Sequence, residues 1–352
     1  MHMADALISP AVGGALWAVT GGVSATCARK LKTSMRGDLI PMMGVLGAFI
    51  FTAQMINFSI PGTGSSGHLG GGLMLAVLLG PYAAFLVIAS VLAVQAFFFA
   101  DGGLLALGCN IFNLGFFPAF VAYPVCYRWL ARDAQGGVRL WGASVLAAVV
   151  GLQLGAFSVV LETWASGVSG LPFGTFLLLM QPIHLAIGVV EGMATAAAVS
   201  FVARARPESL APMRVSPNAS ASLRSVLTGV LLATCALGGA FSWLASTRPD
   251  GLEWAIAKVS GKEEVAGNEG NLHRRLAALQ EKTAILPDYG FKAGAGRAAP
   301  EEATDSVHDA PASEAWPAVD AGTSVAGLVG GAVTLVLACL VGFAVNARQR
   351  AV

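Results

Sequence analysis

Charged residues are scarce in this chain. Asp, Glu, Lys and Arg make up 12% of its 352 residues, about half the share found in an average soluble domain. Hydrophobic residues reach 55%, and the 43 glycines suit the close helix packing of membrane bundles. The formal net charge is only +1, whereas nucleic-acid partners select basic surfaces. The composition therefore indicates an integral membrane protein in contact with membrane lipid and without a nucleic-acid partner.

Several sequence signatures are absent. The five cysteines form no CxxC pair, which argues against a disulfide framework or a cysteine-ligated zinc site. No GxxxxGK[ST] phosphate loop and no HExxH zinc-protease motif occurs. We therefore expect a chain that is not an enzyme and that cannot couple transport to ATP hydrolysis by itself.

Long apolar runs dominate the sequence. A run of about 20 apolar residues spans a bilayer as a helix. Gly80 and Pro81 separate a short third run from the fourth, because proline interrupts a continuous helix. We predict an all-α integral membrane fold, with a seven-helix substrate-binding bundle followed by two further transmembrane helices around an extracytoplasmic segment. The nine predicted spans are 9–28, 39–58, 67–80, 81–100, 104–127, 139–163, 174–202, 224–245 and 322–346.

The positions of Lys and Arg orient these spans. With the N-terminus outside and the C-terminus in the cytoplasm, 13 of the 21 basic residues fall in loops predicted to be cytoplasmic. The other eight lie in one long outer segment, 246–321, and long translocated segments are exempt from the charge rule. No basic residue precedes Arg29, so the first residues do not resemble a secretory signal. The N-terminus is therefore expected to remain on the outer side.

Composition also divides the chain into parts. Residues 1–202 form a seven-span block with short loops, and residues 203–223 are a Pro-, Ser- and Arg-rich stretch typical of a cytoplasmic linker. Residues 224–352 contain two spans around the outer segment 246–321. Within that segment, 257–283 is predicted to form a short helix.

The second residue, His2, has the placement of a metal chelator. The free α-amine of residue 1, the amide nitrogen of His2 and its imidazole can bind one ion through a five-membered and a six-membered ring. Three nitrogens in a plane favour Ni(II) or Cu(II), which accept square-planar geometry. The alternative is a histidine that stands at position 2 by chance.

His68 lies in a glycine-rich turn, 61–72, which the topology places on the same outer side as His2. A loop with so many glycines can fold into the helix bundle, so His68 is a candidate for the fourth ligand position. The alternative is a flexible outer turn with an incidental histidine. Two histidines on one side of the membrane, among only five in the chain, make a metal site the better interpretation.

Other polar residues lie within or beside the predicted spans. Ionisable groups in a span usually face the bundle interior and mark functional sites or polar networks. We expect these residues to support the site rather than to bind the ion, with the two asparagines of the fifth span holding the N-terminal segment by hydrogen bonds. They are Gln54, Asn57, Asn110, Asn113, His184 and Glu191.

Two more histidines, His273 and His308, occur among charged residues of the outer segment. A solvated surface position is the default expectation for both. Transient collection of metal ions is the alternative.

Several of these stretches together resemble one known family. They are similar to the CbiM/NikM proteins, the substrate-capturing membrane subunits of energy-coupling-factor transporters for cobalt and nickel. The resemblance covers about residues 1–202. Its motifs are Met1-His2-Met3-Ala4-Asp5-Ala6-Leu7-Ile8-Ser9-Pro10, Ala53-Gln54-Met55-Ile56-Asn57-Phe58 with the following glycine loop, Asn110-Ile111-Phe112-Asn113, and His184 to Gly192.

The C-terminal part resembles the small two-span N subunit of the same transporters. Its motifs include Arg248-Pro249-Asp250-Gly251-Leu252-Glu253-Trp254 and Leu286-Pro287-Asp288-Tyr289-Gly290-Phe291. The chain then looks like an M–N fusion, and the Pro-Asp-Gly-Leu-Glu form favours nickel over cobalt.

The resemblance implies a ligand set and partners. Its metal ligands carry over to the amine of Met1, the amide nitrogen and imidazole of His2, and the imidazole of His68. The usual family form has Ile at position 3, where this chain has Met3, but no ligand depends on that side chain. Ni²⁺, or Co²⁺, is then the transported substrate at a bacterial inner membrane. A transmembrane coupling subunit and cytoplasmic ATPase subunits are expected on other chains.

Three other functions stay open at this point. A secondary carrier driven by protons would use His184 and Glu191 as a relay. An intramembrane metalloenzyme would use His68 with the same two residues, although the topology places His68 at the outer edge. A vitamin-binding subunit of the same transporter class would bind its substrate without His2.

Overall fold

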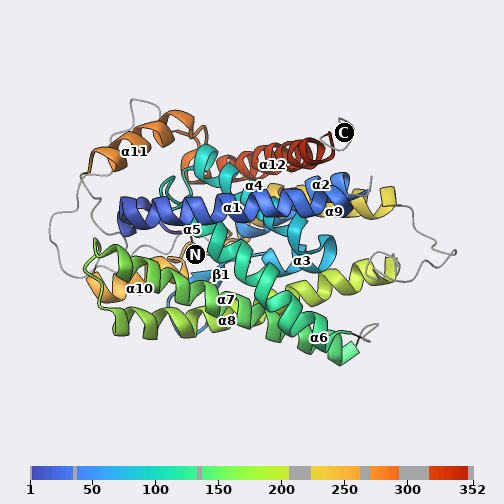
Figure 1. The fold of residues 1–352 in the computed structure, drawn as a ribbon, viewed down its shortest axis with the longest axis horizontal. Helices are drawn as coiled ribbons and strands as arrows, with labels where there is room; N and C mark the ends of the chain where they lie inside the picture. Colours follow the sequence, from blue (N-terminus) through green and yellow to red (C-terminus); the bar gives the residue numbers. More distant parts are fainter. Residues whose placement is uncertain are drawn as a thin grey trace.

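The computed structural model describes residues 2–34, 38–132, 137–205, 223–261, 270–292 and 317–347. These residues form a long bundle of helices (Figure 1). Within these ranges the only strands are two of two residues each. The elements in chain order are η1 (Asp5–Leu7), α1 (Pro10–Ser34), α2 (Leu39–Gln54), β1 (Phe58–Ser59), β2 (Ser66–Gly67), α3 (Gly72–Leu79), α4 (Pro81–Phe99), α5 (Leu107–Ile111), η2 (Phe112–Tyr127), α6 (Arg128–Leu130), α7 (Gly137–Ser166), α8 (Phe173–Ala205), α9 (Leu223–Gly239), η4 (Phe241–Leu244), α10 (Gly251–Ser260), α11 (Asn271–Thr283), η5 (Pro287–Tyr289) and α12 (Ala321–Ala347).

The predicted all-α membrane fold is confirmed. In the described part of the chain, six helical stretches are long and apolar enough to cross a bilayer. They correspond to α1, α4, the continuous run α5–η2–α6, α7, α8 and α12. The apolar helices α2 and α9 are shorter, with 16 and 17 residues.

The predicted third span, 67–80, contains a much shorter helix. Only the eight residues of α3 are helical there. Gly71 has a left-handed φ of 76° just before the helix begins, so the residues in front of it cannot continue α3. Gly80, at φ 83°, separates α3 from α4, whose first residue is Pro81.

Small residues let the helices approach closely. A Cβ atom at Gly192 would lie 2.3 Å from the backbone of Val145, so α8 packs directly on α7. In the same way, a Cβ atom at Gly330 would lie 2.0 Å from Phe51, so α12 packs on α2. The last helix is therefore an integral part of the bundle, beside helices from the first half of the chain (Figure 1).

The residues between α2 and α3 form a glycine-rich loop that turns back into the bundle. Its short strands pair antiparallel, with Phe58 opposite Gly67. Gly62 and Gly64, at φ 78° and 79°, form the turn between them. The loop thus returns towards the helices before α3 begins.

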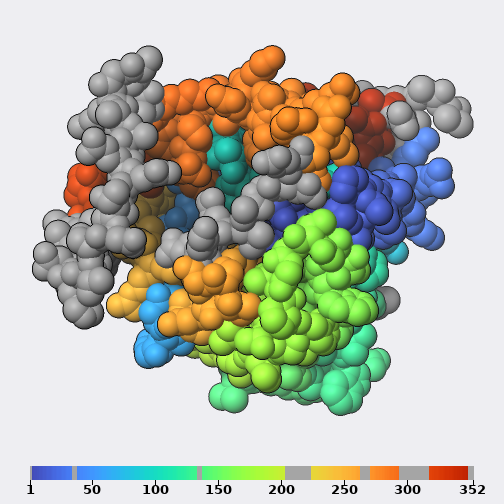
Figure 2. Space-filling view, turned by 90° about the vertical axis from the view of Figure 1, so that its left-hand side faces the viewer, coloured from blue at the N-terminus to red at the C-terminus, as the bar shows by residue number. Residues whose placement is uncertain are grey.

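The helices α10 and α11 lie at one end of the bundle, and α6 lies at the opposite end (Figure 1). Figure 2 looks onto the first end, where these orange segments and the green end of the α7–α8 pair cover much of the surface. The short helix predicted within 257–283 has other bounds in the structure. In the described residues α10 already ends at Ser260, and α11 begins at Asn271.

Candidate metal site

The N-terminal segment is fixed inside the bundle by hydrogen bonds to its backbone. Asn110 Oδ1 accepts from Met3 N at 2.8 Å, and Asn110 Nδ2 donates to Met3 O at 3.2 Å. Gly103 N also donates to Met3 O, at 2.9 Å. The side chain of Met3 is fully buried. These bonds determine the position of His2, whereas Met1 lies outside the described residues.

The His2 and His68 rings meet inside the protein. Their planes are 3° from parallel, and their centroids are 4.9 Å apart. Two segments 66 residues apart in the sequence are thus brought into direct contact. Burial, with a contribution from the charge of His2, lowers the pKa of His68 to about 3. His68 is therefore neutral at physiological pH, and the neutral imidazole is the form that binds metals.

Glu191 holds the glycine loop in this position. Its carboxylate accepts hydrogen bonds from Gly70 N at 2.7 Å and from Gly71 N at 3.1 Å. Gln54 Nε2 donates to Gly70 O at 2.8 Å, and Gln95 Nε2 donates to Gln54 Oε1 at 2.9 Å. These polar groups are all buried, where an unpaired donor or acceptor would be costly. The network therefore holds the backbone that carries His68.

Asp101 is a residue of the site that the sequence patterns did not single out. Its Oδ1 lies 3.1 Å from His2 Nδ1, and its Oδ2 accepts a hydrogen bond from the Tyr289 hydroxyl. Burial raises the pKa of Asp101, but the charge and hydrogen bond of His2 and the bond from Tyr289 outweigh it and lower the pKa to about 2. The carboxylate is therefore ionised beside the imidazole. A single aspartate in the short turn after α4 carries no motif that would have identified it.

Asp250 brings a second carboxylate to the site from the C-terminal part of the chain. It caps α10, and its Oδ1 accepts from Leu252 N at 2.7 Å and from Glu253 N at 2.8 Å. The preceding residues attach to the glycine loop, because Ser66 N donates to Pro249 O at 2.8 Å. The Pro-Asp-Gly-Leu-Glu motif thus forms a helix start that rests on the loop carrying His68.

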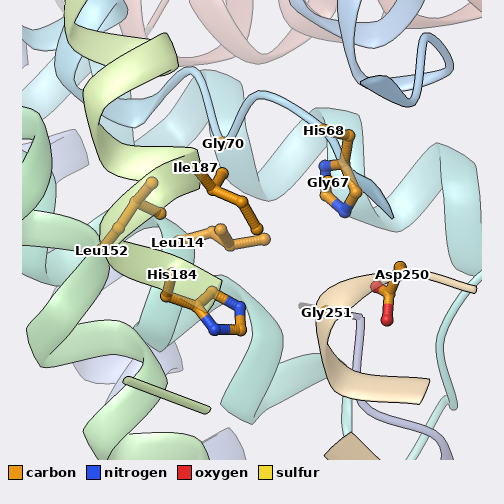
Figure 3. Close-up of a pocket in the computed structure, with 9 residues that line it drawn as sticks. All are labelled: Gly67, His68, Gly70, Leu114, Leu152, His184, Ile187, Asp250 and Gly251. Atoms are coloured by element: carbon orange, nitrogen blue, oxygen red, sulfur yellow. The ribbon is translucent and has the colours of Figure 1, made fainter. Parts of the chain in front are cut away.

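A small pocket joins His68, Asp250 and His184. Figure 3 shows these side chains around it, from the glycine loop, the start of α10 and helix α8. His184 Nδ1 lies 2.7 Å from Met180 O, in the preceding helical turn, and His184 Nε2 has no partner among the described residues. A Cβ atom at Gly251 would lie 3.3 Å from His184 Cε1. His184 therefore lies at the edge of the site, where α10 meets α8.

The two remaining support candidates differ in their contacts. Asn113 Nδ2 donates to Glu162 Oε2 at 2.9 Å and lies 3.9 Å from Met3 Sδ. Asn113 therefore contacts the N-terminal segment through a side chain. Asn57 uses its backbone instead, because its carbonyl accepts from Ser246 N at 2.8 Å. Glu162 was not singled out from the sequence, although a carboxylate inside a span marks a polar network.

The expectation of a solvated His273 is wrong. Its side chain is buried, and His273 Nε2 donates to Ile8 O at 3.0 Å. Helix α11 therefore covers the start of the chain, a contact between residues 265 positions apart. His308 lies outside the described residues.

Within the described ranges, no three His, Cys, Asp or Glu side chains are grouped as metal ligands. The groups that do meet here are the imidazoles of His2 and His68, with the carboxylate of Asp101 beside His2 and that of Asp250 beside His68.

Comparisons with known proteins agree with this arrangement. Residues 2–209 match the family described as "Cobalt uptake substrate-specific transmembrane region", CbiM, and residues 224–347 match the PDGLE domain. The chain is 31% identical over 354 residues to the "Putative fused nickel transport protein NikMN" of Archaeoglobus fulgidus, covering 99% of both chains. It is also 31% identical to the "Fused nickel transport protein NikMN" of Rhodobacter capsulatus, over 82% of this chain and 88% of that one.

A solved structure of a truncated transition metal transporter is similar too. Its TM-score is 0.52 at 28% identity, and the match covers 58% of this chain and 99% of that chain. The family match covers more than half of the residues, one relative matches over its full length, and a solved structure has a similar fold. The chain therefore belongs to the CbiM family of cobalt-uptake transmembrane proteins and carries a PDGLE domain after its CbiM region.

Proposed function

We propose that this protein captures Ni²⁺ from outside the cell as the substrate-specific component of an ATP-driven importer, with Co²⁺ as the alternative substrate. Two relatives that match most of this chain are named as nickel transport proteins, and a relative that matches about half of it is named as a cobalt transport protein. The ion is cargo rather than a resident cofactor, so the site must bind it and later release it.

The stacked pair of His2 and His68 carries this proposal. A chelate through the amine of Met1, the amide nitrogen of His2 and its imidazole leaves one position open in a square plane, and His68 is the imidazole beside it. Deprotonation of an amide nitrogen requires a late transition metal, which disfavours Mg²⁺, Ca²⁺ and Zn²⁺. This chemistry favours nickel.

The carboxylates of Asp101 and Asp250 support binding of a cation. Both residues lie beside a histidine of the pair, and the charge of Asp250 acts on His68. Opposite charges attract more strongly away from bulk water than in it. Because His68 is neutral, these carboxylates favour a metal ion in the site.

The domain boundaries and the topology belong to the same proposal. Residues 1–202 form the metal-capture domain, 203–223 a cytoplasmic linker and 224–352 the N-like domain. The N-terminus and segment 246–321 lie outside, and the C-terminus lies in the cytoplasm of a bacterial inner membrane. The position of α10 and α11 at the end opposite α6 supports this topology (Figure 1). A transmembrane coupling subunit and ATPase subunits on other chains drive release of the ion inward.

The contacts of Glu191 weigh against the proton-carrier alternative. Both of its oxygens accept hydrogen bonds from the backbone of the glycine loop. A proton on this carboxylate would compete with those bonds, so Glu191 fits a structural role better than a relay with His184.

Nickel uptake by cells that express the chain with its coupling and ATPase subunits tests the proposal. Uptake should require His2 and His68, and it should stop when the ATPases are inactivated. The control is Glu281→Gln, at an exposed position on α11, which should leave uptake unchanged. Uptake that continues without active ATPases and depends on a proton gradient would favour the carrier instead.

A further inference from the structure

A tyrosine of the PDGLE domain reaches the metal site through one intervening carboxylate. The Tyr289 hydroxyl donates to Asp101 Oδ2, and Asp101 Oδ1 lies 3.1 Å from His2 Nδ1. The three residues come from the C-terminal segment, from the turn after α4 and from the start of the chain. They form a continuous polar chain between the two matched domains.

The nitrogen held by Asp101 is the one that the chelate needs. A six-membered ring that contains the metal, the amide nitrogen, Cα, Cβ and Cγ of His2 closes through Nδ1. The distal Nε2 would make a larger ring. Asp101 and the metal ion therefore compete for the same atom, and the contact with Asp101 must break before Nδ1 can bind the ion.

Tyr289 is held rigidly in a conformation that is costly for its backbone. Asp288 and Tyr289 have φ values of 50° and 58°, a left-handed region that non-glycine residues rarely adopt. Such strain persists only where the surroundings fix it, and it is frequent at switch and ligand sites.

Those surroundings are the end of α4. The Tyr289 ring stacks on Phe99 with centroids 5.1 Å apart. Ile285 N and Leu286 N both donate to Phe98 O, at 3.0 and 3.2 Å. The segment therefore places the tyrosine hydroxyl on Asp101.

We propose that Tyr289 and Asp101 form a latch that holds His2 Nδ1 in the metal-free protein, so that the PDGLE domain sets the rate at which the chelate closes on the ion. This inference rests on the proposed metal chelate. It adds that Tyr289 and Asp101 control how fast the chelate forms. Tyr289 and Asp101 position His2 and do not bind the ion. The latch opens when the carboxylate turns away from Nδ1, and the tyrosine hydroxyl opposes that movement.

Rapid mixing of Ni²⁺ with the purified, metal-free full chain in lipid nanodiscs tests the latch, with the absorbance of the chelate as the signal. Tyr289→Phe removes only the hydroxyl and keeps the ring on Phe99. This variant should bind Ni²⁺ faster than the wild type. Asp101→Ala should bind it faster still, at about ten times the wild-type rate, because loss of a hydrogen bond to a charged group changes the fraction of free His2 Nδ1 by at least that factor. The double variant should associate no faster than Asp101→Ala alone.

Tyr82→Phe is the matched control, because Tyr82 packs against Phe120 and should leave the rate unchanged. An unchanged rate in Tyr289→Phe, a slower rate in Asp101→Ala, or effects that add in the double variant would each overturn the latch. If Asp101→Ala does not fold, the rates of Ni²⁺ association in Tyr289→Phe and Tyr82→Phe are sufficient to test the latch. An additional alanine between Met1 and His2 separates the two claims. If that insertion leaves binding unaffected, the proposed function fails, whereas an unaltered rate in Tyr289→Phe removes only the latch.

Discussion

Asn110 and Met3 exchange two hydrogen bonds inside the bundle, from Met3 N to Asn110 Oδ1 at 2.8 Å and from Asn110 Nδ2 to Met3 O at 3.2 Å. The side-chain amide of Asn110 thus binds the backbone of Met3 in the way that a neighbouring β-strand would. Because Met3 follows the proposed chelating residue directly, this pairing determines where the chelate can form.

Asn110→Ala should therefore weaken nickel binding. Loss of both bonds frees the N-terminal segment, and groups that orient metal ligands typically contribute about 10- to 100-fold in affinity. Titration of the purified chain with Ni²⁺ measures the change. Asn346→Ala, near the end of α12, is the matched control. Equal affinities for the two variants would show that Asn110 does not position the chelate.

Glu191→Gln should loosen the glycine loop. The amide group that replaces one carboxylate oxygen cannot accept a hydrogen bond from the loop, so Gly70 N or Gly71 N loses its buried acceptor. An unsatisfied buried donor costs about 1–3 kcal/mol. Thermal unfolding in detergent should show a lower midpoint, and Ni²⁺ titration should show weaker binding. Glu281→Gln, at an exposed position on α11, should change neither, and a stable, tightly binding Glu191→Gln variant would contradict the assigned role.

The contribution of His68 to the stability of the protein should fall as the pH drops below about 6.5. His68 takes up a proton in the unfolded chain near its ordinary pKa of 6.5 but in the folded chain only near 3. Acid between these values therefore favours the unfolded state, and the loss is complete near pH 3. Asp101 has a pKa of about 2 in the folded chain and an ordinary pKa of 3.8. It therefore changes the stability only below about pH 3.8 and does not contribute between pH 7 and pH 5. Over that interval His68→Gln should lose less thermal stability than the wild type. Parallel losses in the two proteins would assign the pH dependence to other groups.

Gly330→Ala should separate α12 from α2. The added Cβ atom would lie 2.0 Å from the Phe51 ring, and overpacking of this kind typically costs about 1–3 kcal/mol. The midpoint of thermal unfolding measures the effect. Gly229→Ala in α9 is the matched control, because a Cβ atom there meets no atom within 4 Å. If both variants unfold at the same temperature, the close contact of α12 with the bundle is not required for stability.

The sequence was informative where chemistry depends on position along the chain. His2 was singled out for its position next to residue 1 and His68 for its glycine-rich turn; the structure brings their two rings together, and their role as metal ligands stays a prediction. Long apolar runs likewise predicted the helices of spanning length. These features are local, so the sequence contains them directly.

Contacts between distant segments were not predictable in this way. Tyr289 and Asp101 are 188 positions apart. Tyr289 stands in a stretch that resembles the two-span subunit, but nothing in that stretch indicates a contact with Asp101. His273 looked solvated because its neighbours are polar, but docking of α11 buries it on Ile8. The predicted third span failed because apolar content alone cannot show that Glu191 binds the amides of Gly70 and Gly71 and keeps them out of a helix.

The most direct test of the proposed chelate is the binding of Ni²⁺ and Co²⁺ to the purified full chain with one alanine inserted between Met1 and His2. The insertion keeps every side chain but moves the histidine to position 3, which changes the chelate rings. We predict that nickel binding is lost or that its absorption spectrum changes to another geometry. Binding with unaltered affinity and spectrum would contradict the chelate. The pocket between His184 and Asp250 would then be the next candidate for the binding site.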